Sequence, residues 1–281
     1  MLVVSIVSHG HGEQALALLR QIGQGQASQM PPPLPMRVVL TLNLPEPELA
    51  AAGRQPWPFD LVVQANARPQ GFGANHNQAF ARHAEPFWAT QAAQAAGAQA
   101  AFAVLNPDVT LLGNPWPALM QALAQPQTGC VWPRQLDADG LPQDHERLLP
   151  TPASIAARAW WQARRRLGLR CGTAPGQPGP DAAPDWSNAA FWLVRAQTWR
   201  ELGGFDTRYF MYGEDVDFCL RLQLAGWRLA RAGGASVIHA AQRASHRSGR
   251  HLAWHLRSLL RLWTSPVYAS YRRMQASGKE G

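Results

Sequence analysis

The N-terminal part of the chain alternates between short apolar segments and helix-forming segments, and this alternation constrains the fold more than any other feature. An apolar, β-branched run occupies residues 2–8, and further strand-like segments occupy residues 36–42, 59–65 and 101–108. Residues 13–22 have helical spacing, and the alanine-rich residues 74–97 predict a helix that breaks near Glu85-Pro86. Buried strands separated by helices predict an α/β fold with a mostly parallel central sheet flanked by helices.

The C-terminal half of the chain is less regular. Residues 136–185 contain a basic segment and the turn-rich stretch "TAPGQPGPDAAP", which predicts a loop. Further along, the patterns predict a strand over 188–195, a helix over 214–225, and short strands near 227–231 and 236–239.

Composition narrows the class of protein. The chain has 281 residues, of which 46% are hydrophobic and 16% charged, so it can bury a large core and is not expected to be disordered. Its apolar runs are shorter than the ~20 residues that span a bilayer, and the N-terminus lacks a basic leader. Three widely spaced cysteines without metal-like spacing indicate reduced thiols, so we expect a cytoplasmic protein.

The positive charge is concentrated near the C-terminus. Residues 241–281 contain eight Arg or Lys and one Glu, which accounts for seven of the eight net positive charges. The body is almost neutral, so we expect no nucleic-acid partner. An amphipathic pattern places five apolar residues on one predicted helix face: Leu252, Leu256, Leu259, Leu260 and Trp263. Two interpretations stay open, a helix packed on the body and peripheral contact with an anionic membrane.

Ligands of parallel sheets bind beyond the carboxyl ends of the strands, so polar residues at those ends are candidates. Asp108 ends the strand in "LNPDV", and Pro107 biases Asn106 towards an extended backbone, which defines the position of the carboxylate. A carboxylate at this place could hold Mg²⁺ or Mn²⁺ together with phosphate oxygens. The alternative is an ordinary turn, since Asn-Pro is a common turn dipeptide.

Three acids, Glu214, Asp215 and Asp217, begin the helix predicted over 214–225. Acids are ordinary at a helix N-terminus, where the helix dipole stabilises them by about 0.3–1 kcal/mol. The aromatic residues just before them favour another interpretation. A carboxylate in a partly apolar pocket has the properties of a general base.

Two more segments carry candidate binding residues. His239 follows a short apolar strand and could bind Mn²⁺, and the alternative is a structural, hydrogen-bonded histidine. The stretch "QGFGANHNQAF" places Gly71 and Phe72 at a helix start whose N–H groups could meet phosphate, while Asn77 could bond a sugar or a base. The stretch matches neither the dinucleotide-binding motif nor the P-loop motif.

The order of these segments is more informative than each one alone. The chain contains, in succession, "SIVSHG", "GFGANHN", "LNPDV", "DWSNAAFWLVR", "GGFDTRYFMYGEDVDFCLRLQLAGW" and "SVIH". In this order they resemble family 2 of the inverting glycosyltransferases, particularly its bacterial rhamnosyltransferase-like branch acting on cell-surface polysaccharides. The resemblance covers residues 2–246. It implies a GT-A fold, a nucleotide-diphosphate sugar donor, a divalent metal (Mg²⁺ or Mn²⁺) and a glycan or lipid-linked acceptor.

Carried over by position, the resemblance implies a role for each candidate. Asp108 resembles the metal-binding acid, and His239 resembles the late histidine that can join the metal and the diphosphate. Asp215 resembles the catalytic base, with Glu214 orienting it or the acceptor. The resemblance and the strand ends together assign substrate binding to Ser8, His9, Asn43, Gly71, Phe72, Asn77, Asn106, Trp186 and Asn188.

Three departures from the family pattern fall on the nucleotide side. The acid expected before Asn43 is Leu42, the asparagine expected before Gly71 is Pro69, and Ser8-His9-Gly10 replaces Asn-Tyr-Asn. The metal and base positions are intact. We therefore expect the departures to affect which nucleotide base is recognised, more than whether sugar is transferred.

We expect residues 1–246 to form the glycosyltransferase domain, followed by a basic helical tail over 247–281. Residues 1–135 would bind nucleotide and metal, and 136–246 would supply the acceptor site and the base. Two other functions stay open. One is a non-catalytic GT-A domain that binds sugar nucleotide or a partner, and the other is a basic membrane- or RNA-binding module. The expected location is the cytoplasm, with peripheral contact at the inner face of the cell membrane.

Overall fold

The computed structural model describes residues 1–27, 34–92, 99–179, 182–240 and 249–277. Within these ranges, eight strands form one sheet in the order β3-β2-β1-β4-β9-β6-β10-β5. The strands are β1 (Leu2–Ser8), β2 (Met36–Leu42), β3 (Asp60–Ala65), β4 (Ala101–Leu105), β5 (Val109–Leu111), β6 (Thr128–Leu136), β9 (Phe191–Arg195) and β10 (Arg228–His239). β9 and β5 run antiparallel to their neighbours and the other pairs are parallel, which confirms the mostly parallel sheet.

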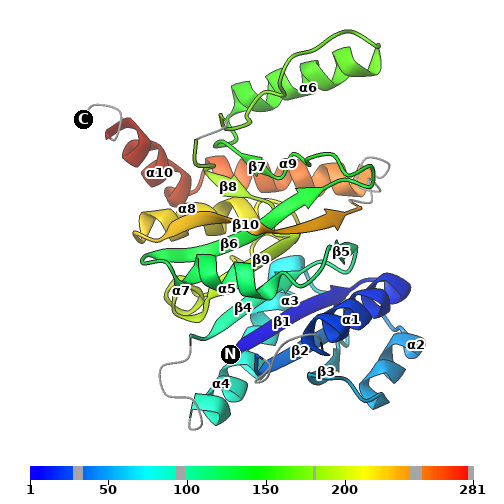
Figure 1. The fold of residues 1–281 in the computed structure, drawn as a ribbon. Helices are drawn as coiled ribbons and strands as arrows, with labels where there is room; N and C mark the ends of the chain where they lie inside the picture. The colour runs from blue at the N-terminus through cyan, green and yellow to red at the C-terminus, as the bar shows by residue number, and fades with distance from the viewer. Residues whose placement is uncertain (28–33, 93–98, 180–181, 241–248, 278–281) are drawn as a thin grey trace.

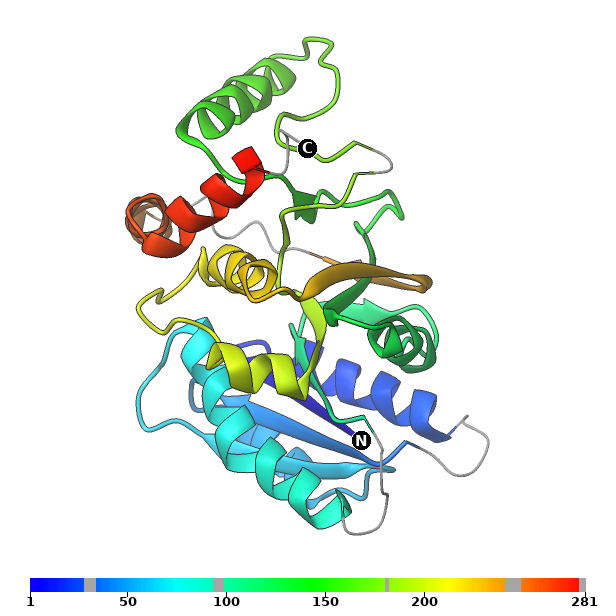
Figure 2. The same cartoon turned by 90° about the vertical axis from the view of Figure 1, so that its left-hand side faces the viewer.

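Helices cover both faces of this sheet. They are α1 (Gly12–Ala27), α2 (Pro47–Ala50), the 3-10 turn η1 (Ala51–Arg54), α3 (Phe72–Ala79), the π-helical turn η2 (Phe80–Ala84), α4 (Glu85–Ala92), α5 (Trp116–Ala124), α6 (Pro152–Arg166), α7 (Ala196–Leu202), α8 (Glu214–Leu224), α9 (Gly249–Trp263) and α10 (Pro266–Ser277). Figure 2 shows α3, α4, α7 and α8 on one side of the sheet and α1 and α5 on the other. A helix long and apolar enough to cross a membrane does not occur among the described residues.

The two helical layers enclose two hydrophobic clusters, one on each face of the sheet. Alternation along β1 divides its side chains between them: Val3 packs with α4 and α7, while Leu2, Val4 and Ile6 pack with α1 and α5. Rings of Phe80, Phe102 and Trp199 pack against each other within the first cluster. Both faces of the central strands are therefore dry, as expected for a parallel sheet covered by helices.

The alanine-rich segment does not break at Glu85-Pro86. It continues from α3 through the π-helical turn into α4, and the N–H of Glu85 bonds the carbonyl of Phe80 across that turn. Because Pro86 has no N–H to donate, a local widening just before it lets the chain stay helical.

The two short strands expected near 227–231 and 236–239 form a single strand, β10. Its register with β6 shifts between Ala232 and Ser236, where Gly233 and Gly234 lie. Glycines tolerate the irregular backbone of such a bulge, so the pairing resumes after it and carries His239 to the end of the strand.

Candidate active site

The candidate residues from four strands share one edge of the sheet. β1, β2, β4, β6 and β10 all point the same way, so their carboxyl ends meet there. Ser8 ends β1, Asn43 follows β2, Asp108 follows β4 and His239 ends β10. This edge is where ligands of α/β sheets bind.

Asp108 and His239 are placed side by side by the antiparallel pairing of β5 with β10. His239 lies opposite Val109 in this ladder, and the N–H of Ala240 donates to the carbonyl of Asp108 at 3.2 Å. The Asp108 Oδ1 and His239 Nε2 atoms are 3.4 Å apart. The structure therefore brings together the two residues that the resemblance implied as metal ligands.

Gln143 fixes the ring of His239, and sequence reasoning missed it. The Gln143 Nε2 donates to the carbonyl of His239 at 3.0 Å, and its Oε1 lies 3.0 Å from His239 Nδ1. Since an amide oxygen only accepts, Nδ1 donates its proton to Oε1, and Nε2 faces Asp108. An imidazole oriented through Nδ1, with Nε2 beside a carboxylate, fits a divalent metal.

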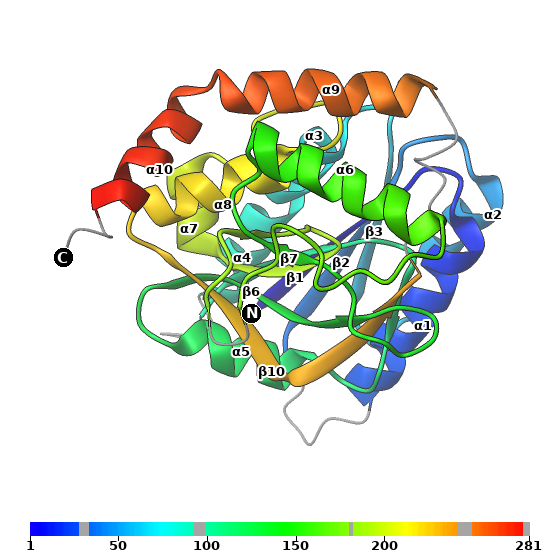
Figure 3. The same cartoon turned by 90° about the horizontal axis from the view of Figure 1, so that it is seen from above.

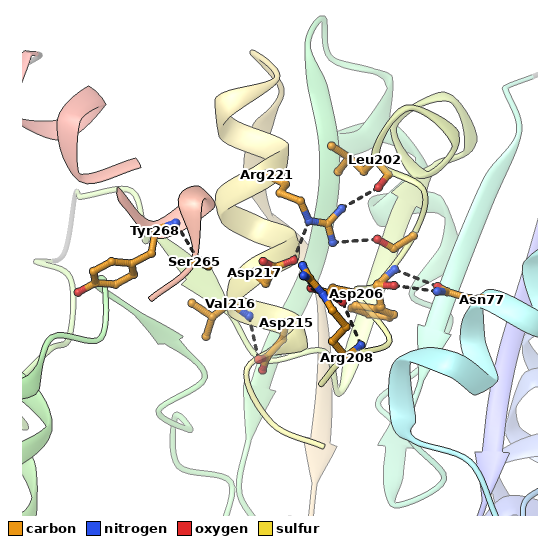
Figure 4. Close-up of polar contacts among 12 residues, drawn as sticks. Asn77, Leu202, Asp206, Arg208, Asp215, Val216, Asp217, Arg221, Ser265 and Tyr268 are labelled. Atoms are coloured by element: carbon orange, nitrogen blue, oxygen red, sulfur yellow. Dashed lines mark hydrogen bonds and ion pairs between the residues drawn. The ribbon is translucent and has the colours of Figure 1, made fainter. Parts of the chain in front are cut away.

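The helix that carries the three acids begins after a sharp turn. Tyr212 (φ 69°) and Gly213 (φ 83°) both have left-handed backbone, and α8 starts at the next residue. Asp215 and Asp217 point in different directions from this helix (Figure 4). Their roles therefore have to be considered separately.

Asp217 is buried and has a structural partner. Its Oδ2 accepts from Arg221 Nε at 2.7 Å, and the same guanidinium donates to the carbonyls of Leu202 and Gly204. This ion pair ties α8 to the turn that follows α7. Of the three acids, Asp217 thus fits the structural interpretation.

A cavity of about 210 Å³ lies beside Asp215. Strands β7 (Glu146–Arg147) and β8 (Trp186–Ser187) and the starts of α6 and α8 wall it, together with α9. Its lining consists of Asp144, His145, Arg147, Pro150, Ile155, Trp186, Asn188, Tyr212, Gly213, Asp215, Val216, His255, Ser258, Leu259 and Leu262. The predicted residues Trp186 and Asn188 thus lie at the same cavity as Asp215.

Burial raises the pKa of both adjacent carboxyl groups, Glu214 and Asp215. Burial raises the pKa of Asp215 to about 6, while the N–H of Val216 and the guanidinium of Arg147 act in the opposite direction. Burial and the charge of Asp215 raise the pKa of Glu214 well above its ordinary value. Of the two, only Asp215 lines the cavity, and its pKa of about 6 leaves it ionised at neutral pH, which suits it to accept a proton.

Arg147 supplies positive charge to this cavity. Its guanidinium donates to the carboxylate of Asp144 at 3.3 Å and lies over the ring of Trp186, with 5.4 Å from Cζ to the ring centroid. Asp144 also pairs with Arg158 of α6. The network joins α6 to the cavity wall. It was not predicted, because residues 136–185 lack a hydrophobic period that would place their side chains.

Asn43 organises the nucleotide side of the edge. Its Oδ1 accepts from Asn66 Nδ2 and from the N–H of Gln70, both at 2.8 Å, and its Nδ2 donates to the carbonyl of Gln70 at 3.0 Å. The same Nδ2 lies 3.0 Å from Nδ1 of the exposed His9. Asn43 thus holds the loop that leads into α3.

A carboxylate does lie on the nucleotide side of the sheet edge, although Leu42 occupies the position where the family pattern has an acid. Glu46 accepts from Ser8 Oγ at 2.9 Å and from the N–H of Gly10 at 3.1 Å. It arrives from the start of α2, a position that the family pattern gave no reason to single out.

The remaining predicted residues have backbone partners. Phe72 donates its N–H to the carbonyl of Phe210 at 3.0 Å. A Cβ on Gly71 would lie 2.5 Å from the same oxygen. Asn77 bonds both backbone atoms of Phe205, accepting from its N–H at 2.9 Å and donating to its carbonyl at 2.8 Å. The N–H of Asn106 donates to the carbonyl of Ala190 at 2.8 Å.

Helix α9, the first helix of the predicted C-terminal tail, lines the cavity beside Asp215. Its orientation differs from the expected one. Leu259 lines the Asp215 cavity, and Trp263 Nε1 donates to the carbonyl of Pro150 at 2.8 Å. Leu252, Leu256 and Leu260 instead face outward, with 53–62% of each residue exposed. The five residues expected on one face are thus divided, because α9 buries a side that includes the small polar residue Ser258.

The chain is similar in sequence to known glycosyltransferases. Residues 178–275 match the family model "Glycosyl transferase family group 2". A segment of 165 residues is 33% identical to N-acetylglucosaminyl-diphospho-decaprenol L-rhamnosyltransferase of Mycobacterium tuberculosis, covering 54% of this chain and 50% of that protein. Rhamnosyltransferase WbbL of Escherichia coli is 43% identical over 83 residues, which are 29% of this chain and 31% of WbbL. The chain spans half or less of the length of these relatives.

A solved structure shares the fold over almost the whole chain. Mannosyltransferase PcManGT from Pyrobaculum calidifontis, in complex with GDP-Man and Mn²⁺, superimposes with a TM-score of 0.51 at 14% identity. The match covers 98% of this chain and 75% of PcManGT. The molecule therefore has the GT-A fold of glycosyltransferases. Residues 178–275 are similar to family 2 glycosyltransferases, and the matched segments of 165 and 83 residues are similar to rhamnosyltransferases.

Proposed function

We propose that this chain is an inverting glycosyltransferase. It would move a sugar from a nucleotide-diphosphate donor to a hydroxyl of a cell-surface glycan or lipid-linked acceptor. One observation carries the proposal: the short segment from Gln143 to Arg147 links the Asp108–His239 pair with the cavity beside Asp215. Gln143 holds His239, while Asp144, His145 and Arg147 line the cavity beside Asp215.

Asp108 and His239 would hold Mg²⁺ or Mn²⁺. Among the described residues, no three His, Cys, Asp or Glu side chains are arranged so that they could hold a metal ion by themselves, so donor phosphate oxygens and water would complete the coordination. When bound, the ion neutralises charge that develops on the departing diphosphate. The mannosyltransferase with the same fold is described with Mn²⁺ and GDP-Man, which supports this assignment.

Asp215 would act on the acceptor. Its carboxylate takes the proton of the acceptor hydroxyl as that oxygen forms a bond to the anomeric carbon. The bond from this carbon to the diphosphate oxygen breaks on the opposite side, so the configuration inverts in one displacement. Glu214 does not line this cavity, and burial together with the charge of Asp215 favours its protonated form. Asp215, which lines the cavity with a pKa of about 6, is therefore the proton acceptor in this proposal.

The relatives suggest the class of donor and acceptor. Two of them are named as rhamnosyltransferases, and one name specifies a diphospho-decaprenol carrier. Transfer of rhamnose to a lipid-linked saccharide is therefore the specific form of the proposal. Apolar cavity residues from α6 and α9, such as Ile155, Leu259 and Leu262, are compatible with an amphiphilic acceptor.

The donor can be identified with a thermal-shift screen of UDP-, dTDP- and GDP-sugars, with and without Mn²⁺. We expect one nucleotide to raise Tm in a Mn²⁺-dependent manner, by mass action on the folded state. The stabilising donor is then supplied with acceptor in a transfer assay. Binding without transfer or donor hydrolysis would favour the non-catalytic alternative, and no binding to any donor would contradict both.

We also propose peripheral contact with an anionic membrane, at the cytoplasmic face. Helices α6, α9 and α10 contain no Asp or Glu. On α9 the exposed leucines recur at every fourth position with exposed Arg257 among them, and Trp160 of α6 is 63% exposed. Figures 1 and 3 place α6 and α9 at the same end of the molecule. Apolar side chains flanked by arginines suit an anionic lipid surface.

Vesicle flotation tests this contact. We expect the protein to float with vesicles that contain phosphatidylglycerol but not with pure phosphatidylcholine, and binding to weaken as salt is raised. Replacing Leu252, Leu256 and Leu260 together with serine should abolish flotation, because each buried apolar side chain contributes to binding. Ala253→Ser, also exposed on α9, is the matched control. Wild-type protein that stays in the lower fraction with anionic vesicles would remove the proposal.

A further inference from the structure

The loop that precedes the base, Tyr209–Gly213, has a conformation that needs support. Tyr212 has a left-handed backbone (φ 69°), which a bulky residue adopts only where its surroundings enforce it. Gly213 continues in the same region (φ 83°), and Asp215 follows within the first turn of α8. The position of the base therefore depends on what holds this loop.

Helix α9 contacts four consecutive residues of the loop. The Ser258 hydroxyl donates to the carbonyl of Met211 at 3.0 Å, and the Tyr212 hydroxyl lies 3.0 Å from His251 Nδ1. Ring contacts add Phe210 with Trp254 (4.9 Å), Tyr212 with His255 (5.1 Å), and Arg261 over Tyr209 (5.9 Å). These α9 residues recur every three or four positions, so they form one face of the helix.

The opposite side of the loop is also fixed. The carbonyl of Phe210 accepts the N–H of Phe72, and Gly71 leaves no room for a side chain against that carbonyl. The loop is thus enclosed between the start of α3 and the inner face of α9. A shift of α9 would be transmitted to α8, because α3 is anchored to the sheet through His76, whose Nδ1 lies 2.8 Å from Ser5 Oγ.

The end of α9 and the following helix are themselves anchored to the cavity wall. Trp263 Nε1 and the Tyr268 hydroxyl both donate to the carbonyl of Pro150, and the Tyr271 hydroxyl donates to buried Asp185 at 2.7 Å. These bonds do not involve the loop. Helix α9 therefore has a defined position from which it can hold the loop.

We propose that α9 is a positioning element of the catalytic base, acting on Asp215 through the loop Tyr209–Gly213. Helix α9 would then be required for the chemical step, in addition to any contact with lipid. This inference rests on the proposed function of Asp215. Helix α9 makes two polar contacts with the loop, Ser258 with Met211 and His251 with Tyr212. These two contacts allow the inference to be tested without removing a large buried side chain.

The test uses the full chain with Ser258→Ala, Tyr212→Phe and both together. A base displaced by a fraction of an ångström to 1 Å loses up to about 10²-fold in rate. We expect kcat of the double variant to fall by about 10- to 100-fold, while donor KM and donor affinity stay within twofold of wild type. Ser258→Thr keeps the hydroxyl and should retain most of the rate. Thr264→Ala is the matched control, because the Thr264 hydroxyl, just after the end of α9, donates to the carbonyls of Leu260 and Arg261 in α9 and not to the loop.

A purely structural role of α9 has a different outcome. It would lower Tm of the double variant while kcat, measured well below that temperature, stays at the wild-type value, and this result would overturn the inference. Hydrogen–deuterium exchange gives a readout that does not need activity: amides of residues 209–213 should exchange faster in the double variant than in Thr264→Ala. If wild-type protein transfers no sugar, the proposed function fails, and unchanged exchange would separately reject the role of α9.

Discussion

Asp215→Asn is expected to lower the rate of sugar transfer by about 10²- to 10⁴-fold, the usual contribution of a general base. The amide has nearly the same shape but cannot take a proton from the acceptor hydroxyl. Donor affinity, measured by calorimetry with Mn²⁺ present, should stay close to wild type, because Asp108 and His239 lie at the other end of the Gln143–Arg147 segment. Transfer at a near wild-type rate would show that Asp215 is not the base.

Stability and pH separate this variant from a merely damaged protein. The raised pKa of Asp215, about 6, means that its ionised form is disfavoured in the fold. Because the pKa of Asp215 is higher in the folded than in the unfolded state, this carboxyl stabilises the fold at pH values below its pKa in the unfolded state. That contribution is lost as the pH rises through about 6. At pH 7, Asp215→Asn should therefore keep or raise Tm. Burial also raises the pKa of Asp217, but Asp217→Asn should lower Tm, since it removes an ion pair at 2.7 Å and leaves the partly buried Arg221 without its carboxylate. Wild-type kcat/KM should rise with pH through about 6.

The sheet could be predicted because each strand has its own local signal. Runs such as 2–8 and 36–42 are long, apolar and β-branched, and their alternation with helices leaves few arrangements besides a parallel sheet. The strand ends then indicate Asp108 and His239 without any knowledge of their contacts. Only the pairing of β5 with β10 brings these two together, and that pairing is not apparent from either segment alone.

The parts of the site that escaped prediction lack such a signal. Gln143 and Arg147 lie in an irregular segment where no period relates position to direction, so their partners depend on the completed fold. On α9, hydrophobicity favours burial of the leucines, but the helix buries Ser258 and exposes Leu252, Leu256 and Leu260. The buried side of α9 also carries Leu262, and there Ser258 donates to the partly buried carbonyl of Met211, so leucine spacing alone does not show which side of the helix faces the body.

Asp108→Ala should remove the effect of Mn²⁺ on donor binding. The variant deletes one of the two side chains that would hold the ion and leaves His239 Nε2 without its neighbouring carboxylate. Loss of an outer-sphere partner typically costs about 10- to 100-fold in metal affinity, and loss of a ligand should cost at least as much. Calorimetric titration of the donor should therefore give the same weak affinity with and without Mn²⁺, whereas wild type binds more tightly when Mn²⁺ is present.

Two further variants make this result specific to the site. Gln143→Leu removes the amide that orients His239 and should give an intermediate loss of the Mn²⁺ effect, because the imidazole keeps its place at the end of β10 but not its fixed tautomer. Asp139→Ala deletes an exposed carboxylate from the turn between β6 and Gln143, and this variant should behave like wild type. Undiminished Mn²⁺-dependent donor affinity in Asp108→Ala would mean that the ion is held elsewhere. The edge of the sheet formed by β4 and β10 would then lose its role in the reaction, whatever the activity of Asp215.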